Sequence, residues 1–183
     1  MSTNGATKLI EVTDLQMHFP LRQGIILQKQ VGAVRAVDGI SFDVFEGETL
    51  GVVGETGCGK STLARLICRL LPVTAGTIEF DGQDITNLKG NPLRLLRREI
   101  QMIFQDPYSS LNPRKRVGAI IGDPFDIHGI ADGNDRKKRV QELMETVGLN
   151  PEHYNRFPAE FSGGQRQRIG VARALALRPK LII

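Results

Sequence analysis

Residues 54–61 read G-E-T-G-C-G-K-S and match the pattern G-x-x-x-x-G-K-[ST] at every fixed position. An apolar stretch at residues 48–53 precedes this loop, and a helical pattern at residues 60–71 follows it. Three glycines let the backbone turn tightly and point N–H groups inward, namely Gly54, Gly57 and Gly59. This context predicts a phosphate-binding loop (the P-loop, residues 54–61) between a strand and the N-terminus of a helix, whose dipole favours negative charge.

Two side chains of the P-loop carry the expected chemistry. Lys60 supplies a cation for the β- and γ-phosphates of a nucleotide, and the Ser61 hydroxyl is a hard oxygen ligand of the kind that Mg²⁺ prefers. We therefore predict that ATP and Mg²⁺ bind here. The predicted nucleotide-binding residues are Gly54, Glu55, Thr56, Gly57, Cys58, Gly59, Lys60, Ser61 and Thr62.

The composition is typical of a soluble globular protein. Of the 183 residues, 40% are hydrophobic and 24% are charged, and no apolar run is long enough to span a membrane. The polar first residues lack the pattern of a secretory signal, which predicts a cytoplasmic protein. Cys58 and Cys68 form no C-x-x-C pair and indicate reduced thiols, with Cys68 in the core and Cys58 at a variable loop position without a chemical role of its own.

Alternating and continuous apolar runs predict strands. They cover residues 9–19, 33–45, 48–53, 77–80, 101–104 and 181–183. Pro20 is expected to end the first strand. Residues 81–82, an Asp-Gly pair, predict a turn, and the alternate residues Ile40, Phe42 and Val44 are expected to share one face of the second strand.

Helical patterns cover residues 60–71, 93–99, 136–147 and 163–177. Pro72 is expected to stop the first of these helices and Gly148 the third. Apolar residues of the third recur at the i, i+3, i+4, i+7 spacing of one buried face, at Val140, Leu143, Met144 and Val147. Strands on both sides of a helix-rich middle predict an α/β core with a helical subdomain.

A second motif, F-S-G-G-Q-R-Q-R at residues 161–168, opens the last predicted helix. Ser162 is the expected N-cap, and two adjacent glycines expose backbone N–H groups at a helix N-terminus, which favours an anion. By itself this motif is more simply a capped helix after a loop. Combined with a P-loop about 100 residues earlier in the same chain, it predicts a second anion-binding site.

Together these motifs resemble the ATP-binding cassette (ABC) family. The string S-G-G-Q-R at residues 162–166 is similar to that family's signature motif, and Gln105 in I-F-Q-D-P is similar to its Q-loop. The resemblance extends from about residue 9 to residue 183. It implies an α/β fold with a P-loop NTPase core of ABC type, an antiparallel β subdomain and a helical insert. We expect a core with the β subdomain at residues 1–105, a helical subdomain at 106–160, and the signature helix with the start of a core strand at 161–183.

The resemblance also implies an ATP hydrolase that works as a head-to-tail pair with a second ABC ATPase subunit. Each ATP then lies between one subunit's P-loop and the other subunit's signature motif. Gln105 and Lys60 are the implied catalytic residues, Ser61 and Gln105 the implied metal ligands, and Phe19 occupies the place of an aromatic that stacks on adenine. A core phenylalanine at a strand end is the alternative for Phe19. The signature residues that are expected to contact the partner's ATP are Ser162, Gly163, Gly164 and Gln165.

Residues 105–114, Q-D-P-Y-S-S-L-N-P-R, look like the Q-loop region of oligopeptide and dipeptide importer ATPases, and the extended segment with H-F-P at residues 18–20 and V-G-A-V-R-A-V-D-G-I-S-F at residues 31–42 is similar too. Related importers for nickel and other solutes share parts of this pattern. The resemblance implies peptide uptake, transmembrane permease subunits that dock at the helical subdomain, and a peripheral location on the cytoplasmic face of the plasma (inner) membrane.

The family pattern continues beyond the signature helix into a strand that ends in Asp-Glu (Walker B), followed by a switch histidine. Here residues 178–183 reach that strand and no later residue supplies these groups. His18, His128 and His153 lie elsewhere in the pattern and are interpreted as ordinary polar residues. We therefore expect a truncated chain that lacks the C-terminal part of the sheet, binds nucleotide weakly and hydrolyses little ATP.

Two alternatives stay open at this point. A soluble ABC-type ATPase that acts on nucleic acid is compatible with the net charge of +4, but the basic residues are spread along the chain and no nucleic-acid partner is expected. The basic run at residues 136–139 is most simply a solvated helix face. The other alternative is a non-catalytic nucleotide-binding fragment that occupies a partner without hydrolysing ATP.

Overall fold

The computed structural model describes residues 7–23, 29–106 and 110–183. The chain divides into two compact units, Met1–Arg94 and Leu95–Ile183. The boundary falls within helix α2 (Gly90–Glu99), which begins three residues before the helix predicted at residues 93–99. The predicted division at residues 105 and 160 remains a prediction.

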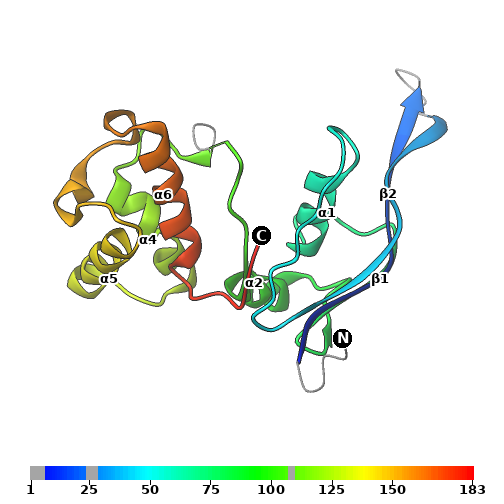
Figure 1. Ribbon diagram of the computed structural model, residues 1–183, viewed down its shortest axis with the longest axis horizontal. Helices are drawn as coiled ribbons and strands as arrows, with labels where there is room; N and C mark the ends of the chain where they lie inside the picture. Colours follow the sequence, from blue (N-terminus) through cyan, green and yellow to red (C-terminus); the bar gives the residue numbers. More distant parts are fainter. Residues whose placement is uncertain (1–6, 24–28, 107–109) are drawn as a thin grey trace. The chain divides into compact units, whose positions relative to one another are not determined.

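The first unit is built on a four-stranded antiparallel sheet in the order β2-β1-β3-β4. Strands β1 (Lys8–Gln23) and β2 (Lys29–Phe45) form the long pair drawn in blue in Figure 1. Strands β3 (Ala75–Phe80) and β4 (Gln83–Asp84) follow. The predicted turn at residues 81–82 joins β3 to β4, with both residues at positive φ (51° and 73°), as a tight hairpin turn requires.

Strand β1 does not end at Pro20, so that expectation was wrong. Pro20 lies inside the strand and pairs with Ala33 of β2. On its other edge β1 pairs with β3 only as far as Gln16, which faces Ala75. Beyond that residue no described strand pairs with this edge, and a proline, which lacks an N–H donor, is tolerated on a free edge.

The sheet packs its apolar residues against helix α1 (Lys60–Ile67) and the segment around residue 85. Leu15, Leu66, Ile78 and Ile85 have no exposed surface. The apolar face predicted for residues 40–44 is confirmed only at its C-terminal end. Val44 is buried, whereas Ile40 is 37% exposed. Register shifts in β1 on both sides of Leu15, opposite this part of β2, interrupt the regular alternation.

The strand predicted at residues 48–53 is absent from the structure. Leu50, Val52 and Val53 are exposed, Val53 to 93% of its surface. A continuous apolar strand is stable only when neighbouring strands pair with it and both faces are covered. No described segment of the chain pairs with these residues, which explains the difference.

Helix α1 (Lys60–Ile67) ends five residues before Pro72, so the proline does not stop it. Its last turn is closed by a left-handed residue, Arg69 (φ 51°). The N–H of Arg69 donates to the Leu66 carbonyl (2.9 Å), and the N–H of Leu70 donates to the Arg65 carbonyl (2.8 Å). This is the Schellman arrangement, here with arginine at the position that glycine usually occupies.

The second unit is a helical cluster. It contains α4 (Val117–His128), α5 (Gly133–Thr146) and α6 (Gly163–Leu175), with 3₁₀ turns η1 (Pro151–Asn155) and η2 (Pro158–Glu160) between α5 and α6 (Figure 1). The short strands β5 (Ile100–Gln101) and β6 (Leu181–Ile182) pair in parallel. The strand predicted at residues 181–183 is confirmed, whereas of the one predicted at 101–104 only residue 101 is in a strand.

The predicted buried face of residues 136–147 is confirmed. Val140 and Met144 of α5 are fully buried, and Leu143 and Val147 pack against the same core. The other members of this core include Ile120, Ile121 and Phe125 of α4 and Ile169 and Ala172 of α6. Gly148 follows α5 with φ 70°, as a helix-ending glycine should. No helix among the described residues has the length and apolarity that crossing a membrane requires.

Candidate nucleotide-binding site

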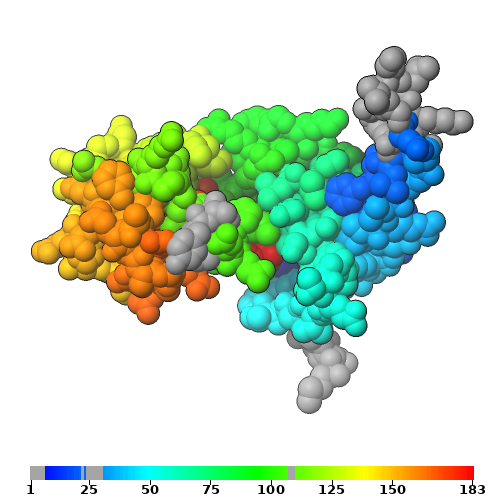
Figure 2. Space-filling view, turned by 90° about the horizontal axis from the view of Figure 1, so that it is seen from above, coloured from blue at the N-terminus to red at the C-terminus, as the bar shows by residue number. Residues whose placement is uncertain are grey.

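The P-loop lies on the surface of the first unit. Residues 51–58 are exposed, and the cyan segment that contains them forms part of the surface in Figure 2. Gly59 is the N-cap of α1, with φ 100° and no side-chain cap. A Cβ atom at Gly59 would collide with the carbonyl oxygen of Ala36 on β2. Both the left-handed backbone and this close approach therefore require glycine.

Lys60 folds back over the loop. Its Nζ atom donates hydrogen bonds to the carbonyl oxygens of Gly54 and Glu55, both at 2.7 Å, and lies 3.7 Å from Cys58 Sγ. The ammonium group is thus held against the loop by neutral acceptors. A phosphate group, which is anionic, would be a stronger acceptor for the same donor.

The start of α1 suits a metal-bound nucleotide. The N–H groups of the first helical turn have no acceptor within the helix and carry the positive end of its dipole. Ser61 and Thr62 place hydroxyl groups in that same turn. The site therefore combines two kinds of groups. The N–H groups and the ammonium group fit the phosphates, and the neutral hydroxyl oxygens fit Mg²⁺.

Phe19 lies outside the buried core, with 36% of its surface exposed. It pairs across the hairpin with Val34. Ala36, whose carbonyl oxygen lies close to Gly59, follows Val34 by two residues on the same strand. The strand partner of Phe19 and the residue that Gly59 approaches thus lie two positions apart on β2.

The neighbouring His18 makes a hydrogen bond to Asp38, which is not one of the predicted site residues. Its Nε2 atom is 2.8 Å from Asp38 Oδ1, and Arg35 Nη1 donates to Asp38 Oδ2 at 3.2 Å. The hydrogen bond from His18, helped by Arg35, holds the pKa of the Asp38 carboxyl below its ordinary value.

The signature motif begins α6 as predicted. Ser162 is the N-cap, and its Oγ atom accepts a hydrogen bond from the Gln165 N–H (3.3 Å). The Gln165 side chain in turn accepts from the Ser162 N–H (3.0 Å), which completes a capping box. The Ser162 hydroxyl proton is left to donate elsewhere. A Cβ atom at Gly164 would meet open space, so this glycine borders room for another molecule.

Gln105 lies in an exposed bend of the second unit that follows β5. Two residues earlier, the N–H of Ile103 donates to the Ile183 carbonyl (2.8 Å). Part of the string that resembles peptide importers, residues 107–109, lies outside the described residues. The structure thus gathers residues 54–62 in one loop with the first turn of α1, and residues 162–165 at the start of α6, whereas Phe19 and Gln105 belong to separate segments.

Sequence reasoning missed a structural role of three arginines on α6. Each donates to a backbone carbonyl of another segment. Arg166 reaches Pro158 (2.8 Å), Arg168 reaches Gly148 (3.2 Å) and Arg173 reaches Ser110 (2.8 Å). The one signal in the sequence is that Arg173 stands between two alanines, Ala172 and Ala174, on a helix whose alanines are buried.

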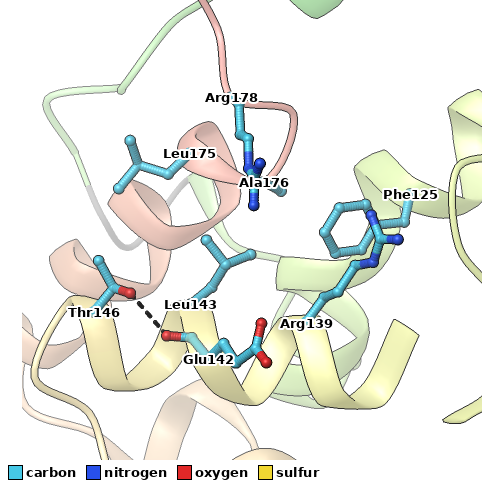
Figure 3. A pocket seen from close by; sticks show the side chains of 8 residues that line it. All are labelled: Phe125, Arg139, Glu142, Leu143, Thr146, Leu175, Ala176 and Arg178. Carbon is cyan, nitrogen blue, oxygen red and sulfur yellow. Dashed lines mark hydrogen bonds between the residues drawn. The ribbon is translucent and has the colours of Figure 1, made fainter. Parts of the chain in front are cut away.

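A separate pocket of about 230 Å³ lies beside α5 and the end of α6. Figure 3 shows its mixed lining, with the Arg178 guanidinium above Leu143 and the Glu142 carbonyl accepting from the Thr146 hydroxyl (2.8 Å). None of the predicted nucleotide-binding residues lines this pocket.

The chain matches the model of the ABC transporter family over residues 37–183, and it belongs to that family. Its similar proteins include the oligopeptide transport ATP-binding proteins AppF and OppF of Bacillus subtilis (strain 168), which are 52% and 53% identical to it. These alignments cover 100% and 96% of this chain and 56% of each relative. The glutathione import ATP-binding protein GsiA of Pectobacterium atrosepticum is 51% identical, over 97% of this chain and 28% of the relative. The chain therefore spans about half, or less, of the length of these relatives.

Solved structures confirm the predicted fold class. The dimeric ATP-binding cassette MJ0796 bound to ADP and Pi is 26% identical, with a TM-score of 0.81 over 95% of this chain and 72% of that protein. The cassette cbiO1 from Clostridium perfringens has a TM-score of 0.75 at 24% identity, over 96% of this chain and 64% of the other, and supports the fold. The relatives named here are transport proteins, so the comparisons do not favour the nucleic-acid alternative. Turnover by these 183 residues alone remains a prediction.

Proposed function

We propose that this chain is the nucleotide-binding part of an ATP-hydrolysing subunit of an ABC importer for oligopeptides or other short peptides. The P-loop carries the proposal, because it places the Lys60 ammonium, held by the carbonyls of Gly54 and Glu55, at the N-terminus of α1, which no side chain caps. The identity of 52–53% with oligopeptide transport ATP-binding proteins supports peptides as the solute.

In this proposal each residue has a separate task. Lys60 and the N–H groups of the P-loop hold the phosphates, and Phe19 stacks on the base. Ser61 and Gln105 would hold Mg²⁺, which would supply positive charge to neutralise the phosphates. Gln105 would also orient the attacking water, so that it acts by positioning, whereas Lys60 acts by its charge.

The partners follow from the second motif. Ser162, Gly163, Gly164 and Gln165 would contact the ATP of a second cassette, in a head-to-tail pair. The dimeric state named for the similar cassette MJ0796 supports this pairing. The helical unit would dock on transmembrane permease subunits at the cytoplasmic face of the plasma membrane.

Nucleotide binding is tested first with Lys60→Ala and, as a matched control, Lys89→Ala, an exposed lysine of the same unit. Calorimetry should show Mg²⁺-ATP affinity at least roughly tenfold lower for Lys60→Ala, since a charge-assisted hydrogen bond contributes about 1.5–3 kcal/mol. Lys89→Ala should bind like the wild type. Equal affinity of both variants would refute the proposed site.

The solute is tested in cells. Disruption of the gene should lower uptake of a labelled tripeptide, and the wild-type gene, but not the Lys60→Ala gene, should restore it. Uptake of ⁶³Ni²⁺ is measured in parallel, because related importers carry nickel. Loss of nickel uptake with normal peptide uptake would retain the ATPase and reject peptides as the solute.

A further inference from the structure

A β-bulge interrupts the pairing of β1 with β2. Met17 of β1 pairs with Val37 of β2. The next residue of β1, His18, pairs with Arg35. Strand β2 therefore advances by two residues where β1 advances by one, and Ala36 is the extra residue. Such a bulge bends the strand locally and changes the direction in which its groups point.

This bulge joins two parts of the predicted nucleotide site. On one side, the carbonyl oxygen of Ala36 is the atom with which a Cβ at Gly59 of the P-loop would collide. On the other side, Val34 lies two residues earlier on β2 and pairs with Phe19. The shape of the bulge therefore sets where the Phe19 ring lies relative to the P-loop, and all of these residues belong to the first unit.

Phe19 and the P-loop lie on the same face of the hairpin. Successive side chains of a strand point to opposite faces, so Phe19 shares a face with Met17. Met17 pairs with Val37, whose Cγ2 atom is 3.7 Å from the position that a Cβ of Gly59 would take. The side chain of His18 therefore lies on the opposite face, away from the P-loop.

A cluster of charged and polar side chains spans the bulge on that opposite face. Asp38 Oδ1 accepts a hydrogen bond from His18 Nε2 (2.8 Å), and Asp38 Oδ2 accepts one from Arg35 Nη1 (3.2 Å). Along β2, Arg35 and Asp38 stand on the two sides of Ala36. The contact with His18 is the better protected from solvent, because its side chain is 23% exposed and that of Arg35 is 70% exposed. His18 is also held by its backbone, whose N–H donates to Thr74 Oγ1 (3.0 Å).

We propose that His18 and Asp38 are positioning residues for the base of the nucleotide. Their hydrogen bond fixes the bulge, and the bulge sets the distance between the Phe19 ring and the phosphates that the P-loop holds. Both residues act through the backbone of the hairpin rather than by touching the nucleotide. This inference rests on the proposed function, in which Phe19 stacks on the base.

The same hairpin offers a matched control near the start of β1. Lys8 Nζ lies 3.0 Å from Asp43 Oδ2 of β2 and 3.0 Å from Glu11 Oε2. This cluster also combines a contact across the hairpin with a pair three residues apart on one strand. The side chain of Asp43 is 35% exposed, close to the 45% of Asp38. Its loss should weaken the hairpin without moving Phe19.

The experiment uses the full-length protein with Asp38→Ala, Asp38→Asn and Asp43→Ala. Calorimetry gives the affinities for Mg²⁺-ADP and for Mg²⁺-pyrophosphate, which carries phosphates but no base. Asp38→Ala should bind ADP roughly fivefold to tenfold more weakly and pyrophosphate within about twofold of the wild type, since stacking on an aromatic ring contributes only to the first. Asp38→Asn keeps an oxygen acceptor and should recover most of the ADP affinity. Asp43→Ala should bind both ligands like the wild type.

A double substitution tests whether Asp38 acts through Phe19. Phe19→Ala alone should weaken the binding of ADP and leave the binding of pyrophosphate unchanged. Asp38→Ala added to Phe19→Ala should weaken ADP binding no further, because two substitutions that remove the same interaction are not additive.

The outcomes separate the inference from the function on which it rests. A wild type that binds neither ligand refutes the proposed function, and a Phe19→Ala variant with normal ADP affinity refutes the proposed role of Phe19. If Phe19→Ala behaves as expected, the inference fails when Asp38→Ala binds ADP normally, when it weakens both ligands equally, or when its effect adds fully to that of Phe19→Ala. Should Asp38→Ala not fold, His18→Ala decides by the same two affinities.

Discussion

The two glycine-containing helix starts of this protein are built in different ways. At α1, the N-cap is Gly59 in a left-handed conformation, and no side chain caps the helix. At α6, Ser162 and Gln165 close a capping box directly after Phe161, which is 4% exposed. The first start leaves its N–H donors to a ligand, whereas the second satisfies two of them within the chain.

Because of this difference, we expect the two helix starts to have different roles: one binds the chain's own nucleotide, and the other contacts the nucleotide of a second subunit. The P-loop has an ammonium group, open N–H groups and hydroxyls, so it should hold phosphates without help from another chain. The signature turn is already fixed by its own side chains and has no lysine or arginine before Arg166. It offers a hydroxyl and the open surface at Gly164, which suits contact with a nucleotide that another subunit already holds.

The largest expected effect is that of Gly59→Ala. The new Cβ would meet the Ala36 carbonyl and occupy a left-handed backbone, which we expect to destabilise the first unit by about 2–5 kcal/mol and to abolish ATP binding. Gly82→Ala is the control, because Gly82 has φ 73° but open space around its Cβ position. It should lower the free energy of unfolding by about 1–2 kcal/mol, measured by urea denaturation. Equal losses would show that the close approach to β2 is unimportant.

The next effect concerns the two cysteines at opposite ends of α1. Cys58 is exposed in the P-loop, whereas Cys68 is buried and burial raises the pKa of its thiol to about 11. A thiol with a raised pKa stays protonated until the pH approaches that value, so at pH 8 only about one Cys68 in a thousand is a thiolate. Mass spectrometry should show iodoacetamide labelling of Cys58 at least roughly 100-fold faster than labelling of Cys68.

Addition of Mg²⁺-ATP sharpens the labelling experiment. Bound nucleotide should slow the reaction of Cys58, whose Sγ lies 3.7 Å from Lys60 Nζ, and leave Cys68 unaffected. Labelling of Cys58 that is insensitive to ATP would contradict the P-loop as the nucleotide site.

Ser162→Ala tests the other helix start and should lower the stability of the isolated chain without changing that chain's own affinity for nucleotide. Loss of the capping box is expected to lower the free energy of unfolding by about 1 kcal/mol, and Ser162→Thr, which keeps the hydroxyl, should restore most of it. Affinity of the isolated chain for ATP, measured by calorimetry, should not change. A tenfold weaker affinity would mean that the signature turn also binds the chain's own nucleotide.

The smallest effect on stability is expected for Gly164→Ala. Its Cβ would enter open space, and a glycine replaced in a helical turn should raise the free energy of unfolding by about 0.5 kcal/mol. The same methyl group would occupy the surface offered to the partner's nucleotide, so ATPase activity of the full-length protein should fall. Unchanged activity together with raised stability would remove Gly164 from the predicted site.

Most short-range features could be read from the sequence. The turn at residues 81–82, the N-cap Ser162, the glycine after α5 and the buried face of α5 all depend on neighbours within a few residues. The prediction of a strand at residues 48–53 was wrong because strand formation depends on residues that are distant in sequence. Its apolar residues are compatible with a buried strand, but a strand also needs partners, and those are set by distant segments.

The sequence by itself determined the P-loop, the signature turn and the alternation of strands with a helical middle, because each rests on local backbone preferences and on the spacing of apolar residues. Only the tertiary structure decided that β1 continues through Pro20, that Gly59 packs against Ala36, and that Arg173 holds Ser110. These features join residues that are far apart in sequence. They depend on which edge is free, how closely two backbones approach and which carbonyl a buried cation can reach, and no local pattern encodes those distances.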